Sequence, residues 1–227
     1  MNNIAHRYGL QSFGKPNLLC AALVLFMLTG PLVGSESTPW GRLLMYAVLS
    51  AVFITGPLSA SRTRAELWLT CGLALLVLSS GLMSYLFADA AVIATAFGVL
   101  FFGLMARQVG RQLMEVNSEV NTQTLWTAIN FYILIGLFFA FLYAAVAIYD
   151  HHAFVGKFMD QPLRDQLYGF VYFSFVTLTT LGYGDITPNN VVVGTFTYME
   201  AIFGQLFIAI MVARLVGLYT TRQTMRG

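Results

Sequence analysis

The segment TLTTLGYGDITP, from Thr177 to Pro188, is polar and rich in glycine, yet it lies between two long apolar stretches. Glycine can adopt backbone conformations that side chains forbid, so Gly182 and Gly184 would let successive carbonyl groups point the same way. Non-helical backbone at membrane depth persists only where it is buried in protein or lines a watery cavity. We therefore interpret the segment as a column of carbonyl oxygens, which suits a dehydrated alkali cation.

The sequence as a whole has the composition of a membrane protein. Its 227 residues are 58% hydrophobic and only 10% charged, whereas soluble domains carry about 25% charged residues. The formal net charge of +2 gives no reason to expect a nucleic-acid partner. Cys20 and Cys71 lie inside apolar blocks, so we interpret them as small buried residues rather than as a disulfide or a metal site.

Six apolar blocks are long enough to cross a bilayer, and they predict an all-α membrane protein with six transmembrane helices. The expected spans are Pro16–Gly34, Arg42–Ala60, Leu67–Phe87, Ala90–Ala106, Thr127–Tyr149 and Val191–Leu218. A further apolar stretch, Leu167–Leu178, is too short to cross, so it is predicted to be a re-entrant helix.

The distribution of basic residues predicts the orientation. With both termini in the cytoplasm, only Arg42, Lys157 and Arg164 would face the outside, as the positive-inside rule favours. A cleaved signal peptide is the alternative for the first block, but no clean small-x-small cleavage site follows it. We expect a multi-pass protein of the plasma membrane, or of the inner membrane if the chain is bacterial, with both termini cytoplasmic.

The motif TLGYGD, Thr180 to Asp185, resembles the selectivity filter of potassium channels, usually written TVGYGD, with Leu181 at the position of the common valine. The resemblance extends to Thr177 and Thr179 before the motif and to Thr187-Pro188 after it. It covers roughly residues 127–218, a little under half of the chain. A chance occurrence is improbable, because the flanking apolar stretches are also those that the family requires.

The resemblance implies a role for each residue of the motif. The carbonyl groups of Thr180, Leu181, Gly182 and Tyr183 would coordinate K⁺, and the Thr180 hydroxyl would close the inner end. Gly184 would shape the outer mouth, and Asp185 would anchor the filter from behind. Further expected filter support comes from Thr179 and from the pore-helix aromatic residues Tyr172 and Phe173.

One such loop per chain implies a homotetramer around one axis. The expected partners are K⁺ as the permeant ion, membrane lipid and three further copies of the chain, with no cofactor and no enzymatic step. A potassium transporter subunit is one alternative, although transporters resemble stacked pore repeats with degraded filters. A non-conducting membrane scaffold with a vestigial loop is the other.

The resemblance divides the chain into four parts: a four-helix membrane domain (1–106), an interfacial linker helix (107–125), a pore domain (126–219) and a short cytoplasmic tail (220–227). The linker prediction rests on an apolar stripe formed by Val109, Leu113, Val116 and Val120. An ordinary solvated loop is the alternative for this linker. The first four spans resemble a voltage sensor in number only, because Ala90–Ala106 contains no basic residue.

Several other residues of the pore domain receive a candidate role. Gly204 falls where many family members carry a hinge glycine, and close packing against the pore helix is the alternative. Glu200 is a carboxylate deep inside a span, with either a tuning or a structural role. His151 and His152 would sense external protons, bind a metal or remain solvated. A hydrophobic gate is expected further along the last span, at Val212, Ala213 and Val216.

Overall fold

The computed structural model describes residues 15–33, 39–84, 87, 89–114, 122–161 and 163–224. The described chain is nearly all helical. Its helices are α1 Pro16–Val33, α2 Pro39–Ala60, α3 Arg64–Met83, α4 Asp89–Met114, α5 Thr122–Tyr149, α6 Leu163–Leu178 and α7 Val191–Thr224. The other elements are β1 Phe154–Gly156, the 3₁₀ helix η1 Lys157–Asp160 and β2 Ile186–Pro188.

Four of the described helices are long and apolar enough to cross a membrane: α3, α4, α5 and α7. The apolar segments Pro16–Thr29 of α1 and Ala47–Ala60 of α2 are shorter. The apolar helices indicate a membrane protein, and the full number of six spans stays a prediction.

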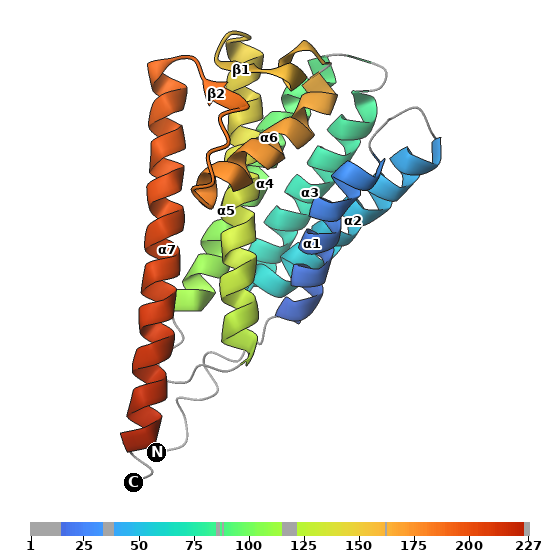
Figure 1. Ribbon diagram of the computed structural model, residues 1–227. Helices are drawn as coiled ribbons and strands as arrows, with labels where there is room; N and C mark the ends of the chain where they lie inside the picture. Colours follow the sequence, from blue (N-terminus) through green and yellow to red (C-terminus); the bar gives the residue numbers. More distant parts are fainter. Residues whose placement is uncertain are drawn as a thin grey trace.

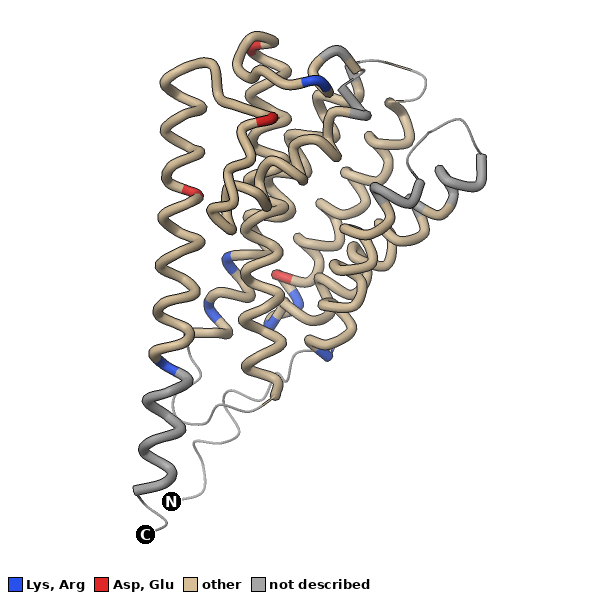
Figure 2. Tube along the Cα trace, in the orientation of Figure 1, with Lys and Arg blue, Asp and Glu red and all other residues tan. Residues whose placement is uncertain are grey.

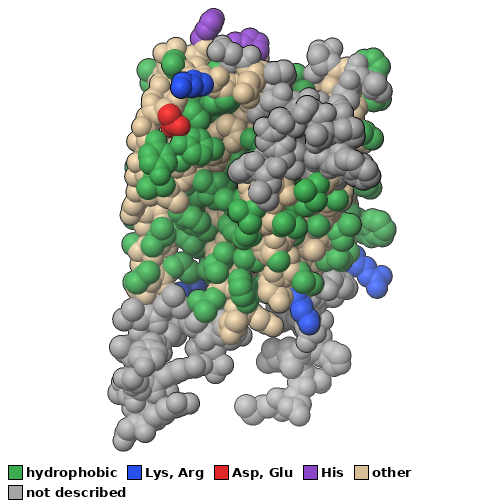
Figure 3. All heavy atoms as spheres, turned by 45° about the vertical axis from the view of Figure 1, so that its right-hand side comes forward, with side chains coloured by type: hydrophobic (Ala, Val, Ile, Leu, Met, Phe, Trp, Pro, Cys, Tyr) green, Lys and Arg blue, Asp and Glu red, His purple; other side chains and the backbone are tan. Residues whose placement is uncertain are grey.

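The exposed surface of α3 supports a lipid environment. Trp68, Leu75 and Leu82 are seven residues apart, so they lie on one helical face, and they are 76%, 67% and 63% exposed. A soluble protein would seldom leave such a stripe uncovered. Hydrophobic side chains also cover the middle of the face shown in Figure 3, with basic side chains toward its upper and lower ends.

Helix α5 lies between the bundle of α1 to α4 and the pair α6 and α7 (Figure 1). An aromatic cluster joins α2, α4 and α5: Phe101 contacts Phe53 and Phe102 at centroid distances of 4.6 and 5.2 Å, and Phe102 contacts Phe141 at 5.0 Å. Gly98 of α4 makes room for this packing, because a Cβ there would overlap the Phe141 ring. The four-helix bundle therefore packs directly on the α5 of its own chain.

Helix α4 is longer than the predicted fourth span, which ended at Ala106. It continues without a break to Met114, so residues 107–114 belong to α4 rather than to a separate interfacial helix. The reason is packing: Val109 and Leu113 are buried in the protein at 3% and 5% exposure, not spread on a membrane surface. Val116 and Val120, the rest of the predicted stripe, lie outside the described residues, as do residues 225–227 of the predicted tail.

Basic residues lie toward the two ends of the bundle, whereas an acidic residue also lies near the middle of α7 (Figure 2). Most of the basic residues lie toward the end away from β1 and β2 (Figure 2). Along the chain, described basic residues precede α1 (Lys15), lie around the start of α3 (Arg62 and Arg64) and near the end of α4 (Arg107 and Arg111), and occur in α7 (Arg214). Arg111 pairs with Glu66 at 3.8 Å and so joins α4 to α3. The middle of α4 carries no basic side chain.

A short β ribbon was missing from the all-α prediction. Strands β1 and β2 pair antiparallel, with Phe154 opposite Pro188 and Gly156 opposite Ile186. The ribbon fixes the segment after the TLGYGD motif against the loop that follows α5.

Candidate functional site

Helix α6 is the platform of the candidate site. It begins near the β ribbon and ends at mid-height beside α5 and α7, without reaching the far end of the bundle (Figure 1). The structure thus contains a helix where a re-entrant one was predicted, and it ends at the expected Leu178. Phe173 is buried in α6 and packs on Tyr143 and Phe154, with centroids 5.1 and 5.6 Å away. Phe173 therefore supports the helix rather than touching the motif.

The motif begins as the C-terminal cap of α6. The Leu181 N–H donates to the Val176 carbonyl at 2.9 Å, and the Thr180 N–H donates to the Thr177 carbonyl at 2.9 Å. With Thr180 in the left-handed conformation at φ 59°, these two bonds form a Schellman motif. The Gly182 N–H also reaches the Val176 carbonyl, at 3.3 Å. The motif is therefore fastened to the helix end through its own backbone.

Positive φ angles recur at every second residue of the motif. They are 59° at Thr180, 55° at Gly182 and 78° at Gly184, while Leu181 and Tyr183 between them have ordinary φ. Alternation of left-handed and ordinary backbone turns successive carbonyl groups toward one side instead of opposite sides. Thr180 is the one non-glycine residue with positive φ in the described chain, a strained state for a β-branched residue and a mark of functional sites.

The outer end of the motif is held by an aromatic side chain of α6. The Tyr172 hydroxyl donates to Asp185 Oδ2 at 2.9 Å, and the Tyr172 ring stacks on Tyr183 with centroids 6.4 Å apart. This hydrogen bond raises the pKa of Tyr172 above its ordinary value, so the hydroxyl keeps its proton at neutral pH. Thr179 does not support the motif directly, because its hydroxyl donates to the Phe175 carbonyl.

Gln205 contacts the inner end of the motif, which the sequence analysis did not foresee. Its Nε2 donates to Thr180 Oγ1 at 2.8 Å. An amide inside the apolar run of the last helix was the signal that could have drawn attention to it. Residues 7 and 11 positions further along a helix return to the same face, so Val212 and Val216 follow Gln205 along α7. Val212 is 53% exposed, and the side chain of Val216 lies outside the described part.

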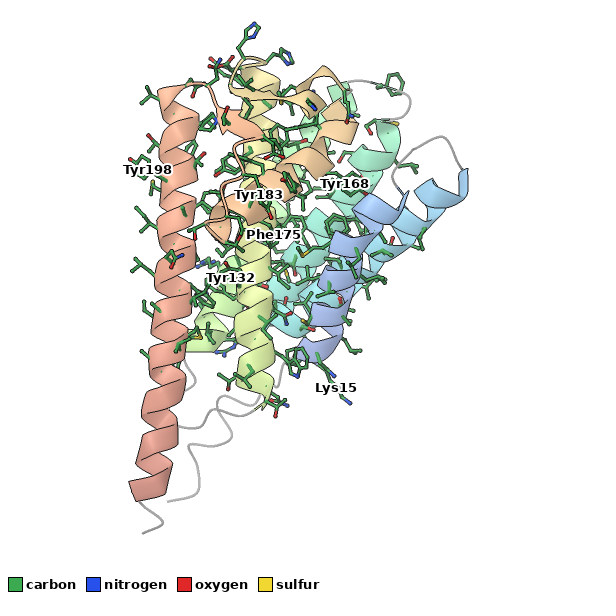
Figure 4. All side chains as sticks on the ribbon, in the orientation of Figure 1. Lys15, Tyr132, Tyr168, Phe175, Tyr183 and Tyr198 are labelled. Carbon is green, nitrogen blue, oxygen red and sulfur yellow. The ribbon has the colours of Figure 1, made fainter. Side chains whose placement is uncertain are left out.

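Gly204 packs against the last residue of α6. A Cβ at this position would overlap the carbonyl oxygen of Leu178. The same carbonyl accepts a hydrogen bond from the Tyr132 hydroxyl at 3.2 Å (Figure 4). The contact favours the packing interpretation of Gly204, while its predicted role as a hinge and the gate at Val212, Ala213 and Val216 stay predictions.

The remaining candidates lie on either side of this site. Glu200 is fully buried between α7, α5 and α6. His151 and His152 lie in an exposed turn after α5. In the described part of the chain, no group of His, Cys, Asp and Glu side chains could hold a metal ion.

Comparisons with known proteins agree with this geometry. A protein-family model described as an ion channel matches residues 131–221, which include α6, the motif and most of α7. The two-pore potassium channel 3 of Arabidopsis thaliana is 48% identical over 46 residues, which make up 20% of this chain and 11% of that protein. No solved structure matches. Residues 131–221 are thus similar to ion channels, and a 46-residue segment is similar to part of a potassium channel.

The Tyr172–Asp185 hydrogen bond generates a first prediction. Tyr172→Phe keeps the ring that stacks on Tyr183 but removes the hydroxyl, so the outer end of the motif should lose its anchor. We expect a partial loss of potassium over sodium preference in a liposome flux assay. Tyr149→Phe, the same change on the last residue of α5, which is 94% exposed, is the control and should have no effect. Equal flux and preference in both variants would show that the bond does not hold the motif.

The Gly204 contact generates a second prediction. Gly204→Ala should force α7 away from the end of α6 and destabilise the protein by about 1–3 kcal/mol, the usual cost of overpacking. Gly194→Ala, on the same helix and with no atom within 4 Å of its Cβ, is the control. Thermal unfolding followed by size-exclusion chromatography measures both. If Gly204→Ala melts like the control and only its open probability falls, the glycine is a hinge.

Proposed function

We propose that this chain is the subunit of a potassium-selective channel. Four copies would place their Thr180–Asp185 segments around a common axis and conduct K⁺ passively down its gradient, with no chemical step. The observation that carries the proposal is the alternation of positive φ at Thr180, Gly182 and Gly184. Rings of carbonyl oxygens built in this way replace the hydration shell of the ion.

The exposure of the motif supports an assembly of several copies. Leu181 and Tyr183 are 60% and 66% exposed in the single chain, although both flank the proposed ion path. Ile202, Leu206 and Ile210 of α7 form an apolar stripe on one helical face and are 54–61% exposed. Neighbouring copies around a fourfold axis would cover such surfaces, and one loop per chain then completes a ring of four.

Each residue of the motif has a place in this channel. The carbonyl groups from Thr180 to Tyr183 would bind K⁺ along the axis, and the Thr180 hydroxyl, oriented by Gln205, would form the inner end. The negative end of the α6 dipole would face the cation just below the motif. The end of the bundle rich in basic residues would be cytoplasmic, in a plasma membrane or bacterial inner membrane.

A flux assay tests the proposal against its rivals. Purified protein in liposomes loaded with KCl should release K⁺ with no energy source and should release Na⁺ far more slowly. A transporter subunit would require a coupled ion or an energy source, and a non-conducting scaffold would release neither ion. Absence of K⁺ release at a protein density that gives several tetramers per vesicle would contradict the proposal.

The left-handed conformation at Gly182 generates a further prediction. Gly182→Ala meets no atom within 4 Å, but the φ of 55° is strained for alanine, so the carbonyl groups should turn out of line. We expect loss of potassium preference or of all flux in liposomes. Gly72→Ala on α3, where the Cβ also meets nothing and φ is ordinary, is the control and should conduct normally. Unchanged potassium preference in Gly182→Ala would exclude the assignment of the filter.

The absence of basic residues from the middle of α4 predicts weak voltage dependence. Moving one charge across the full membrane field is worth about 2.3 kcal/mol per 100 mV, and the part of α4 within the membrane offers none. Open probability in planar bilayers should therefore change little between strongly negative and strongly positive potentials. A steep conductance–voltage curve would contradict this and would assign gating charge to Arg107 and Arg111.

A further inference from the structure

Glu200 is a carboxyl-bearing residue in the middle of α7. Its side chain is 0% exposed and turns toward α5 and α6, so it does not face the proposed ion path. In the described part of the chain, no basic side chain pairs with it. Arg214 lies on the same helix but about 21 Å further along the axis. An unpaired buried carboxylate would be costly in this environment.

Glu200 and the two hydroxyl groups beside it take part in three oxygen–oxygen contacts. The Tyr143 hydroxyl of α5 lies 2.6 Å from Oε2. Ser174 Oγ of α6 lies 2.5 Å from Oε1 and 2.7 Å from the backbone carbonyl oxygen of Gly136 on α5. The Thr197 hydroxyl also lies within hydrogen-bond reach of Tyr143, but it donates to the Val193 carbonyl at 2.8 Å. A backbone carbonyl only accepts hydrogen bonds, so the protons of the three contacts must come from Tyr143, Ser174 or Glu200.

Counting protons decides the state of the carboxyl group. Tyr143 and Ser174 supply one proton each, which satisfies two of the three contacts. The third proton is available only if Glu200 carries it: Glu200 then donates to Ser174, and Ser174 donates to the Gly136 carbonyl. If Glu200 were ionised, the single proton of Ser174 could serve only one of its two contacts. In the other contact, the lone pairs of two oxygen atoms would face each other in a buried site, which is destabilising.

We propose that Glu200 is a neutral carboxylic acid and a positioning residue, which joins α7 to α6 by hydrogen bonds and presents no charge to the permeant cation. The protonation state stands on the contacts alone, and only the consequence for selectivity rests on the proposed channel function.

The position of Ser174 connects this group to the motif. Ser174 precedes Val176 by two residues, and the Val176 carbonyl holds the N–H groups of Leu181 and Gly182. Glu200 meets Ser174 and Gly204 meets Leu178, so contacts recur every four residues on both helices. Helix α7 therefore contacts α6 at two successive turns. A displacement of Glu200 would shift the end of α6 and with it the backbone of the filter.

Infrared spectroscopy tests the protonation state without any need for conduction. Near pH 7 solvent-exposed carboxyl groups are ionised, so a carboxylic-acid C=O stretch in the purified protein reports a buried acid. We expect this band in the wild type, its loss in Glu200→Gln, and its retention in the control Glu66→Gln, which removes a carboxylate paired with Arg111. A wild-type spectrum without the band, or one that Glu200→Gln leaves unchanged, would overturn the proposal.

Potassium and sodium flux in liposomes tests the positioning role. The glutamine amide can donate to Ser174 and its oxygen can accept from Tyr143, so Glu200→Gln should keep the flux and the potassium preference. Glu200→Ala, which removes the hydrogen bonds from α7 to Ser174 and Tyr143, should lose the preference. If Glu200→Gln loses flux or preference despite a normal tetramer, the charge matters and the proposal fails. A wild type that conducts no K⁺ would contradict the channel function instead, and the infrared result would still decide the state of Glu200.

Discussion

The end of α6 is the constraint on which the candidate site depends. Its Val176 carbonyl accepts the N–H groups of both Leu181 and Gly182, and this return of the backbone requires Thr180 to adopt a left-handed conformation. Once the first residue of the motif is left-handed, the alternation that continues at Gly182 and Gly184 keeps the carbonyl groups on one side. The end of the preceding helix therefore determines the backbone geometry of the motif. A helix end that moved would move every proposed ligand.

Helices α5 and α7 hold that helix end in place. Tyr132 of α5 donates to the Leu178 carbonyl, and Gly204 of α7 brings the last helix against the same oxygen. Behind these contacts, Phe173 packs α6 onto Tyr143 and β1 in an aromatic cluster. The bundle of α1 to α4 packs against the other side of α5. The bundle thus has a structural part in the candidate site even though its fourth helix lacks gating arginines.

Local features of this protein could be predicted from the sequence, and contacts between distant segments could not. The glycine pattern at Gly182 predicted positive φ, and the apolar blocks predicted the helices, because both follow from steric and solvation rules that act within a few residues. The hydrogen-bond partners of Gln205 and Glu200 depend on how α7 packs against α6 and α5. The hydrophobic periodicity of the sequence does not predict that packing. The end of α4 was predicted wrongly because an apolar stripe on a helix can pack against either protein or a membrane surface. The β ribbon was missed because strands of three residues carry no periodic signal.

The most direct test of the central claim is a cryo-electron microscopy structure of the purified protein in KCl. The account predicts four copies around one axis, with ion density between successive planes of carbonyl oxygens from Thr180 to Tyr183. An assembly in which the four motifs do not meet on an axis would contradict it. So would carbonyl groups that alternate in direction along the motif with no ion density between them.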